Sequence, residues 1–254
     1  MSCDIQRIAV VRIGLLLLSL LFFSFTNAEP LRVGSLAYDP PFAVEADKQG
    51  HFFGFEIDIM LEVCRRIQAN CSFLPLTFPE IFTSLMANQI DLGLASISIT
   101  EDRQQTFLFS TPYLTSSVRF IALAKSAINN ESNLIGKKVG AVRGSIFKSV
   151  VLAKLGNDVR IIEYPTLLEE LQALSNKEVD GIIADTGTAK YWVATNSAML
   201  KLVGQPINVG IGYGIMTTKT KAALIARINN ALFAMEKDGT YLKIYNRYFL
   251  NLTQ

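Results

Sequence analysis

A run of small hydroxyl residues followed by one arginine, residues 94–103, offers the clearest chemistry in this chain of 254 residues. A strand-like segment, residues 90–94, leads into the hydroxyl cluster, and Arg103 follows five residues after Ser98. Small hydroxyl side chains let a ligand approach the backbone closely, and a guanidinium offers a forked pair of donors for a carboxylate. The pattern favours a binding site for a carboxylate-bearing small molecule over a strand followed by an ordinary N-capped helix.

A second motif, residues 107–113, follows with the sequence Phe-Leu-Phe-Ser-Thr-Pro-Tyr. Together the two motifs resemble the signature of the periplasmic amino-acid-binding proteins of ABC importers, solute-binding protein family 3. The likeness extends along the chain after its first 28 residues. It implies a free amino acid as the ligand.

Strand and helix alternate along the chain, which predicts parallel sheets with helices on both faces. Ligands of such sheets bind outside the carboxyl ends of the strands. Two extended stretches, residues 116–122 and 206–213, are expected to cross between two lobes. The predicted strands are 31–35, 73–76, 138–142, 159–162 and 179–184, and the predicted helices are 55–63, 79–88, the segment after Ser145 to about 155, 166–175, 219–236 and 239–248.

The resemblance implies a particular α/β architecture, the two-lobed periplasmic binding protein of type II. In that fold each lobe is a mainly parallel sheet flanked by helices, and two strands form the hinge. We expect residues 29–117 plus 210–254 to form a discontinuous first lobe and residues 118–209 to form the second.

A free amino acid needs a carboxylate receptor and an ammonium receptor a few ångströms apart. Arg103 is the expected carboxylate partner, and the backbone N–H groups of Ser145 and Ile146 at a helix start would assist it, since helix N-termini favour anions. Asp185 at a strand end would bind the ammonium, together with the Ser98 hydroxyl and the Ser96 carbonyl. The family uses the matching arginine, serine and aspartate in these roles.

Aromatic residues are expected to form the walls of the pocket. Phe78 matches a position where relatives place an aromatic ring over the ligand side chain. The first loop contains both Tyr38 and Asp39 where relatives have one ligand-facing position, so these two residues compete for it.

The sequence also departs from the family's basic-amino-acid binders. Those proteins have an acidic residue shortly before the loop tyrosine and a serine at the start of the hydroxyl cluster, whereas this chain has residues 35–37 (Ser-Leu-Ala) and Ala95. Ile146 also replaces a threonine. A cationic ligand side chain would therefore need another acid, for which Asp39 and Glu80 are the candidates.

The first 28 residues have the pattern of a secretory signal peptide. Arg7 and Arg12 precede an apolar run, residues 13–25, and small residues suited to a signal peptidase follow at 26–28. The run is shorter than the roughly 20 residues of a spanning helix. We expect cleavage before Glu29 and a periplasmic protein, with an uncleaved anchor as the alternative.

Two cysteines, Cys64 and Cys71, remain after residues 1–28 are removed. An oxidising compartment favours a disulfide between them, and the histidine- and lysine/arginine/ornithine-binding branch of the family has a cysteine pair at this place. Two cysteines and the single His51 cannot complete a tetrahedral metal site. We expect neither a metal nor a cofactor.

Charge and composition exclude some partners. The net charge of +2 falls to +1 without residues 1–28, and no basic run occurs, so a nucleic-acid partner is not expected. The sequence predicts a monomeric binding component of an ABC transporter that delivers arginine or another basic amino acid to a membrane permease and its ATPase. The alternatives are a binding protein for a polar or apolar amino acid, a ligand sensor, or a dehydratase-like enzyme on the same fold.

Overall fold

A computed structural model describes residues 30–252 of the chain. The predicted signal peptide, residues 1–28, lies outside this range. Within it, no helix is both long and apolar enough to cross a membrane.

The first lobe is built on a five-stranded sheet. In this sheet β1 (Leu31–Leu36) pairs in parallel with β5 (Cys71–Leu76) and with β6 (Leu92–Leu94), and β13 (Met216–Thr218) runs antiparallel between β6 and β7 (Phe107–Phe109). A small antiparallel sheet of β2 (Tyr38–Asp39), β3 (Ala43–Glu45) and β4 (Phe52–Phe53) extends the loop after β1.

Helices cover both faces of this sheet. On one face α2 (Phe55–Arg66), α8 (Ala222–Lys237) and α9 (Thr240–Phe249) share one apolar cluster with β1, and Phe55, Ile59 and Val63 of α2 are fully buried in it. The helical spacing of these three residues predicted α2. On the other face α3 (Phe78–Met86) begins with a capping box between Thr77 and Glu80 and buries Ile81 and Leu85.

The second lobe contains the other five-stranded sheet. Its order is β10 (Arg160–Tyr164), β9 (Lys138–Val142), β11 (Gly181–Asp185), β8 (Ser117–Leu123) and β12 (Leu200–Asn208), with β8 antiparallel to both of its neighbours. One apolar cluster lies under α5 (Phe147–Leu155), and another lies under α6 (Leu167–Ser175) and α7 (Thr186–Thr195). Sequence reasoning missed α7 and most of β12.

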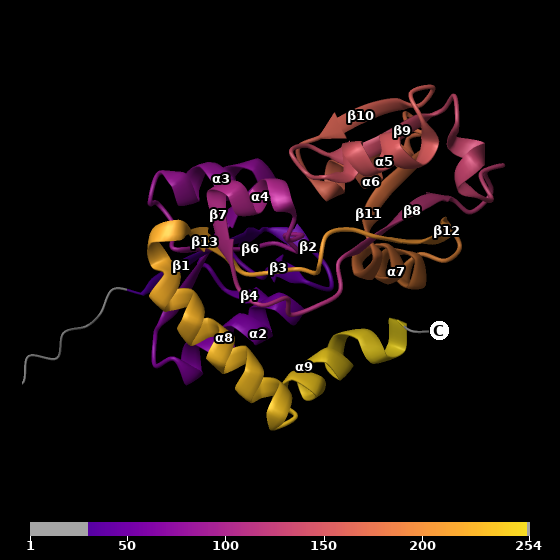
Figure 1. Cartoon of the computed structure of the whole chain (residues 1–254). Coiled ribbons are helices and arrows are strands. Elements are labelled where there is room, and N and C mark those ends of the chain that lie inside the picture. The colour runs from indigo at the N-terminus through magenta and orange to yellow at the C-terminus, as the bar shows by residue number, and fades with distance from the viewer. Residues whose placement is uncertain (1–29, 253–254) are drawn as a thin grey trace, which may run out of the picture.

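Two neighbouring segments connect the lobes, as Figure 1 shows where the chain enters β8 and leaves β12. Tyr213 donates its backbone N–H to the Leu114 carbonyl at 2.8 Å, and Val209 donates to Ser116 at 3.0 Å. The pairing of the two extended stretches is thus as predicted, but most of residues 116–122 belongs to β8, inside the second sheet. The division of the lobes at 117/118 and 209/210 stays a prediction.

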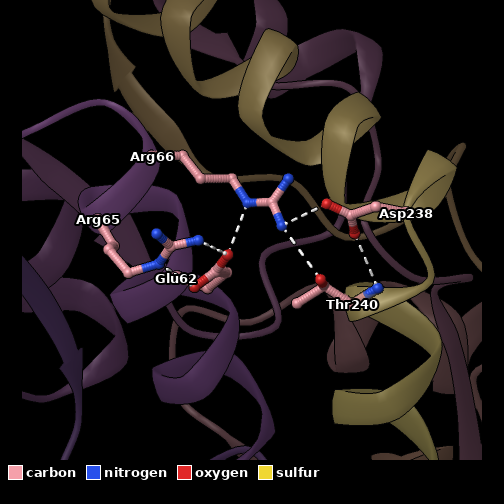
Figure 2. A network of polar contacts seen from close by, with 5 residues as sticks. All are labelled: Glu62, Arg65, Arg66, Asp238 and Thr240. Carbon is pink, nitrogen blue, oxygen red and sulfur yellow. Dashed lines mark hydrogen bonds and ion pairs between the residues drawn. The ribbon is translucent and has the colours of Figure 1, made fainter.

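A polar network fixes the last two helices to α2 (Figure 2). Arg66 donates to Glu62 at 2.6 Å and to Asp238, in the turn between α8 and α9, at 2.8 Å. Hydrogen bonds from Arg65 at 2.7 Å and from Arg66 lower the pKa of Glu62 to about 2. Asp238 also accepts from the Thr240 N–H at the start of α9, so the network links all three helices.

The predicted disulfide between Cys64 and Cys71 is present. It joins the last turn of α2 to the first residue of β5. It restricts the unfolded chain more than the folded one, and because the loop is short this stabilisation is modest.

Replacing both cysteines with alanine is expected to lower the free energy of unfolding by about 2–3 kcal/mol. Urea unfolding followed by circular dichroism measures this change. A reductant should destabilise the wild-type protein by a similar amount and leave the double variant unchanged. Equal urea midpoints for the wild-type and variant proteins would contradict the stabilising role of the disulfide.

Candidate ligand-binding site

A cavity of about 400 Å³ lies between the two lobes, and both lobes line it. It lies at the carboxyl ends of β1, β6, β9 and β11, as expected for parallel strands. The structure brings all the predicted ligand residues around this one cavity: Tyr38, Asp39, Phe78, Ser96, Ser98, Arg103, Ser145, Ile146 and Asp185.

Arg103 lies on α4 (Glu101–Thr106), a short helix capped by Thr100. Its guanidinium carbon is 5.4 Å from the ring centre of Phe78 and 5.2 Å from that of Phe82, and its Nη1 donates to the Ser98 carbonyl at 2.9 Å. Burial lowers the pKa of Arg103 to about 10, so it stays charged at neutral pH. No carboxylate of residues 30–252 lies within ion-pair distance of it, so the guanidinium can pair with an incoming carboxylate.

Asp185 ends β11 and occupies the N-cap position of α7, but its side chain makes no capping hydrogen bond. Instead, its Oδ1 accepts from the Tyr213 hydroxyl at 2.5 Å. Burial, together with the negative charge of Asp39, raises the pKa of Asp185 well above its usual range. A bound cation would relieve this cost.

The structure distinguishes between the two candidates in the first loop. Tyr38 is 42% exposed, and its ring lies 6.3 Å from the Trp192 ring. Asp39 is only 5% exposed, and its Oδ1 accepts from the Thr188 hydroxyl at 2.7 Å. Because Asp39 belongs to β2 and Thr188 to α7, this hydrogen bond joins the two lobes across the cavity. Burial raises the pKa of Asp39 to about 6.

Glu80, the other candidate acid, also lines the cavity, but it is engaged in the α3 capping box. Its Oε2 accepts from the Thr77 N–H at 2.8 Å and from the Thr77 hydroxyl at 2.7 Å. These hydrogen bonds lower the pKa of Glu80. Asp39 is therefore better placed than Glu80 to pair with a cationic ligand side chain.

The two serines of the hydroxyl cluster have different partners. The Ser98 hydroxyl lies 2.7 Å from that of Ser116, in the segment that enters the second lobe. The Ser96 N–H donates to Glu56 Oε1 at 2.7 Å. Burial raises the pKa of Glu56 to about 7, although hydrogen bonds from Tyr113 and Ser96 oppose the rise.

The second lobe contributes the turn between β9 and α5. Gly144 has a φ of +74°, and a Cβ there would lie 3.0 Å from Pro79, so this turn approaches the first lobe closely. Ile146 is the N-cap of α5, and Ser145 lies one residue before it. The Ser145 hydroxyl donates to the Val142 carbonyl at 2.6 Å and accepts from the Phe147 N–H at 3.2 Å.

Sequence reasoning missed three residues that support the site, Glu56, Thr188 and Tyr213. Glu56 follows Phe55 near the start of a helix, where an acidic residue ordinarily favours the helix dipole. Thr188 lies on the missed helix α7, and Tyr213 lies in a stretch assigned only to the hinge. Each contacts a residue at least 28 positions away, so no local signal identifies its role.

The geometry defines a class of protein, a two-lobed α/β protein with a cavity between its lobes that charged, hydroxyl and aromatic residues line. Residues 31–251 match the model of the bacterial extracellular solute-binding proteins, family 3, and the chain belongs to this family. Its fold is that of the two-lobed periplasmic binding proteins, as the resemblance implied. Within residues 30–252, no group of histidine, cysteine, aspartate and glutamate side chains is arranged to hold a metal ion.

Three relatives illustrate the match. ABC transporter arginine-binding protein 1 of Escherichia coli is 31% identical over 92% of this chain and 98% of its own length. The lysine/arginine/ornithine-binding periplasmic protein of the same organism is 32% identical over 87% and 88%. The crystal structure of an arginine transport system periplasmic binding protein from Legionella pneumophila superposes with a TM-score of 0.84 at 36% identity, over 87% of this chain and all of that one.

The raised pKa of Asp39 makes stability depend on pH. An acid with a higher pKa in the folded chain stabilises the fold below its unfolded pKa, and this contribution is lost as the pH rises through the folded value. For Asp39 the loss falls between about pH 3.8 and about 6. Asp39→Asn is therefore expected to stabilise the ligand-free protein by about 3 kcal/mol at pH 7.5 and by little at pH 3.5.

Urea titrations of the two proteins at both pH values measure this difference. The acidic pH is the internal control, because Asp39 is protonated there. Equal stabilities at pH 7.5 would contradict the burial of Asp39 in the ligand-free protein.

Proposed function

We propose that this protein is the periplasmic binding component of an ABC importer for arginine or another basic amino acid. The observation that carries the proposal is the charge imbalance of the cavity. Asp39 and Asp185 bring it two carboxyl groups besides Glu80, which Thr77 engages. Arg103 brings one guanidinium. Relatives named for arginine, or for lysine, arginine and ornithine, support the same ligand class.

The charges of a free amino acid can be matched to these groups. Its carboxylate would form a forked pair with Arg103, and its ammonium would bind Asp185, the Ser98 hydroxyl and the Ser96 carbonyl. This zwitterion neutralises only Asp185 of the two acids. A positively charged ligand side chain would then pair with Asp39. A neutral ligand side chain is disfavoured, because it would leave the buried Asp39 carboxylate unpaired.

Closure of the lobes would couple binding to transport. Arg103 lies in the first lobe and Asp185 in the second, so only the closed form satisfies both ends of the ligand. A ligand that binds the closed form more tightly shifts the population toward it. We propose that a membrane permease and its ATPase recognise this closed form.

Several finer features belong to the same proposal. A signal peptide cleaved before Glu29 would deliver a monomeric protein to the periplasm. The protein would act by binding alone, without a cofactor and without catalysis. The nine cavity residues named above would be its ligand contacts.

A thermal-shift screen of residues 29–254 against each free amino acid, after removal of any bound ligand, tests this function. At a thousandfold excess over Kd, binding adds about 4 kcal/mol to the free energy of unfolding. We expect the largest shifts with arginine, lysine or ornithine. A larger shift with polar or apolar amino acids would overturn the basic specificity, and no shift with any amino acid would overturn the binding function.

A further inference from the structure

A fully buried glutamate, Glu56, lies directly behind the ligand cavity. It is on the first turn of α2, and its Oε1 accepts from the Ser96 N–H at 2.7 Å and from the Ser96 hydroxyl at 3.2 Å. The Tyr113 hydroxyl donates to the same oxygen. Glu56 therefore accepts its hydrogen bonds from Ser96, a residue of the predicted ammonium site, and from Tyr113.

Ser96 needs such support because of its backbone conformation. Its φ is +46°, in the left-handed region that side chains other than glycine rarely adopt. Within residues 30–252, the other non-glycine residues with positive φ are Gln68, Asn88 and Lys177. Each of these follows the end of a helix by two residues, where the left-handed conformation is common.

Ser96 has no such local reason for its conformation. It follows β6 and lines the ligand cavity, and it is 4% exposed. A left-handed residue away from a helix end costs free energy, and the surrounding structure must supply the compensation. The two hydrogen bonds from Ser96 to Glu56 are the contacts that can supply it.

We propose that Glu56 is a positioning residue for ligand binding. By holding Ser96 in the left-handed conformation, it sets the direction of the Ser96 carbonyl and the course of the chain into Ser98. Both groups belong to the ammonium receptor of the proposed function, on which this inference rests. Glu56 itself touches no ligand in this account, because its carboxylate lies behind the serine.

The test is a rescue experiment. Glu56→Ala removes the support, so arginine binding measured by calorimetry should weaken about tenfold or more. Glycine adopts positive φ without strain, so adding Ser96→Gly to Glu56→Ala should restore affinity by about threefold or more. A merely structural loss of a buried side chain would not respond to a change of backbone freedom at residue 96.

Two controls make the comparison specific. Ser96→Gly alone should not improve the wild-type protein. Glu170, in α6 of the second lobe, is also fully buried and has no contact with Ser96 among the hydrogen bonds of the described chain, so Ser96→Gly should not improve Glu170→Ala either. Thermal melts establish that each variant is folded, and Glu56→Leu, which also lacks an acceptor, replaces Glu56→Ala in the same comparison if the alanine variant does not fold.

Three results would overturn the inference. These are wild-type affinity in Glu56→Ala, no gain on adding Ser96→Gly, or an equal gain in the Glu170→Ala background. If the wild-type protein itself binds no amino acid, the proposed function fails and this inference fails with it. If the wild-type protein binds arginine and only the rescue fails, the proposed function stands and the role of Glu56 is rejected.

Discussion

The two lobes enclose a cavity with more acidic than basic groups, and the rest of this structure depends on that constraint. A guanidinium and three carboxyl groups line one cavity, and two of the acids, Asp39 and Asp185, have few polar partners of their own. Burying charge away from water is costly unless a partner offsets it. The cost appears as a lowered pKa for Arg103 and raised pKa values for Asp39 and Asp185.

The fold arranges these charges by simple means. Parallel strands end at the same edge of each sheet, so the loops after β1 and β6 meet the loops after β9 and β11. Arg103 lies over two adjacent phenylalanine rings, Phe78 and Phe82, which contact its guanidinium without neutralising its charge. Hydrogen bonds across the lobes, from Thr188 to Asp39 and from Tyr213 to Asp185, hold the acids in place.

Many of the residues that line the cavity could be predicted from the sequence, because their signals are local. The hydroxyl run follows an apolar strand pattern, Asp185 ends another, and Arg103 follows Ser98 by five residues. The competition between Tyr38 and Asp39 could not be decided in the same way. Both residues line the cavity, and only the folded chain shows that Asp39 is buried while Tyr38 is exposed.

The supporting residues could not be predicted because they act over long sequence separations. Glu56 contacts Ser96 across 40 positions, and Thr188 contacts Asp39 across 149. The helix α7 was missed because Thr186–Thr195 has no distinct apolar face and contains a glycine, and only Thr188 and Ala189 are fully buried in it. Tertiary packing, rather than local pattern, defines this part of the cavity.

A comparison of arginine with citrulline, its neutral isostere, tests the central claim most directly. Both amino acids present the same ammonium and carboxylate, so only the charge of the side chain differs. Calorimetric titration of the wild-type protein at pH 7.5 should give an affinity for arginine about a hundredfold higher, because only arginine can pair with Asp39. Equal affinities, or tighter binding of citrulline, would contradict the account.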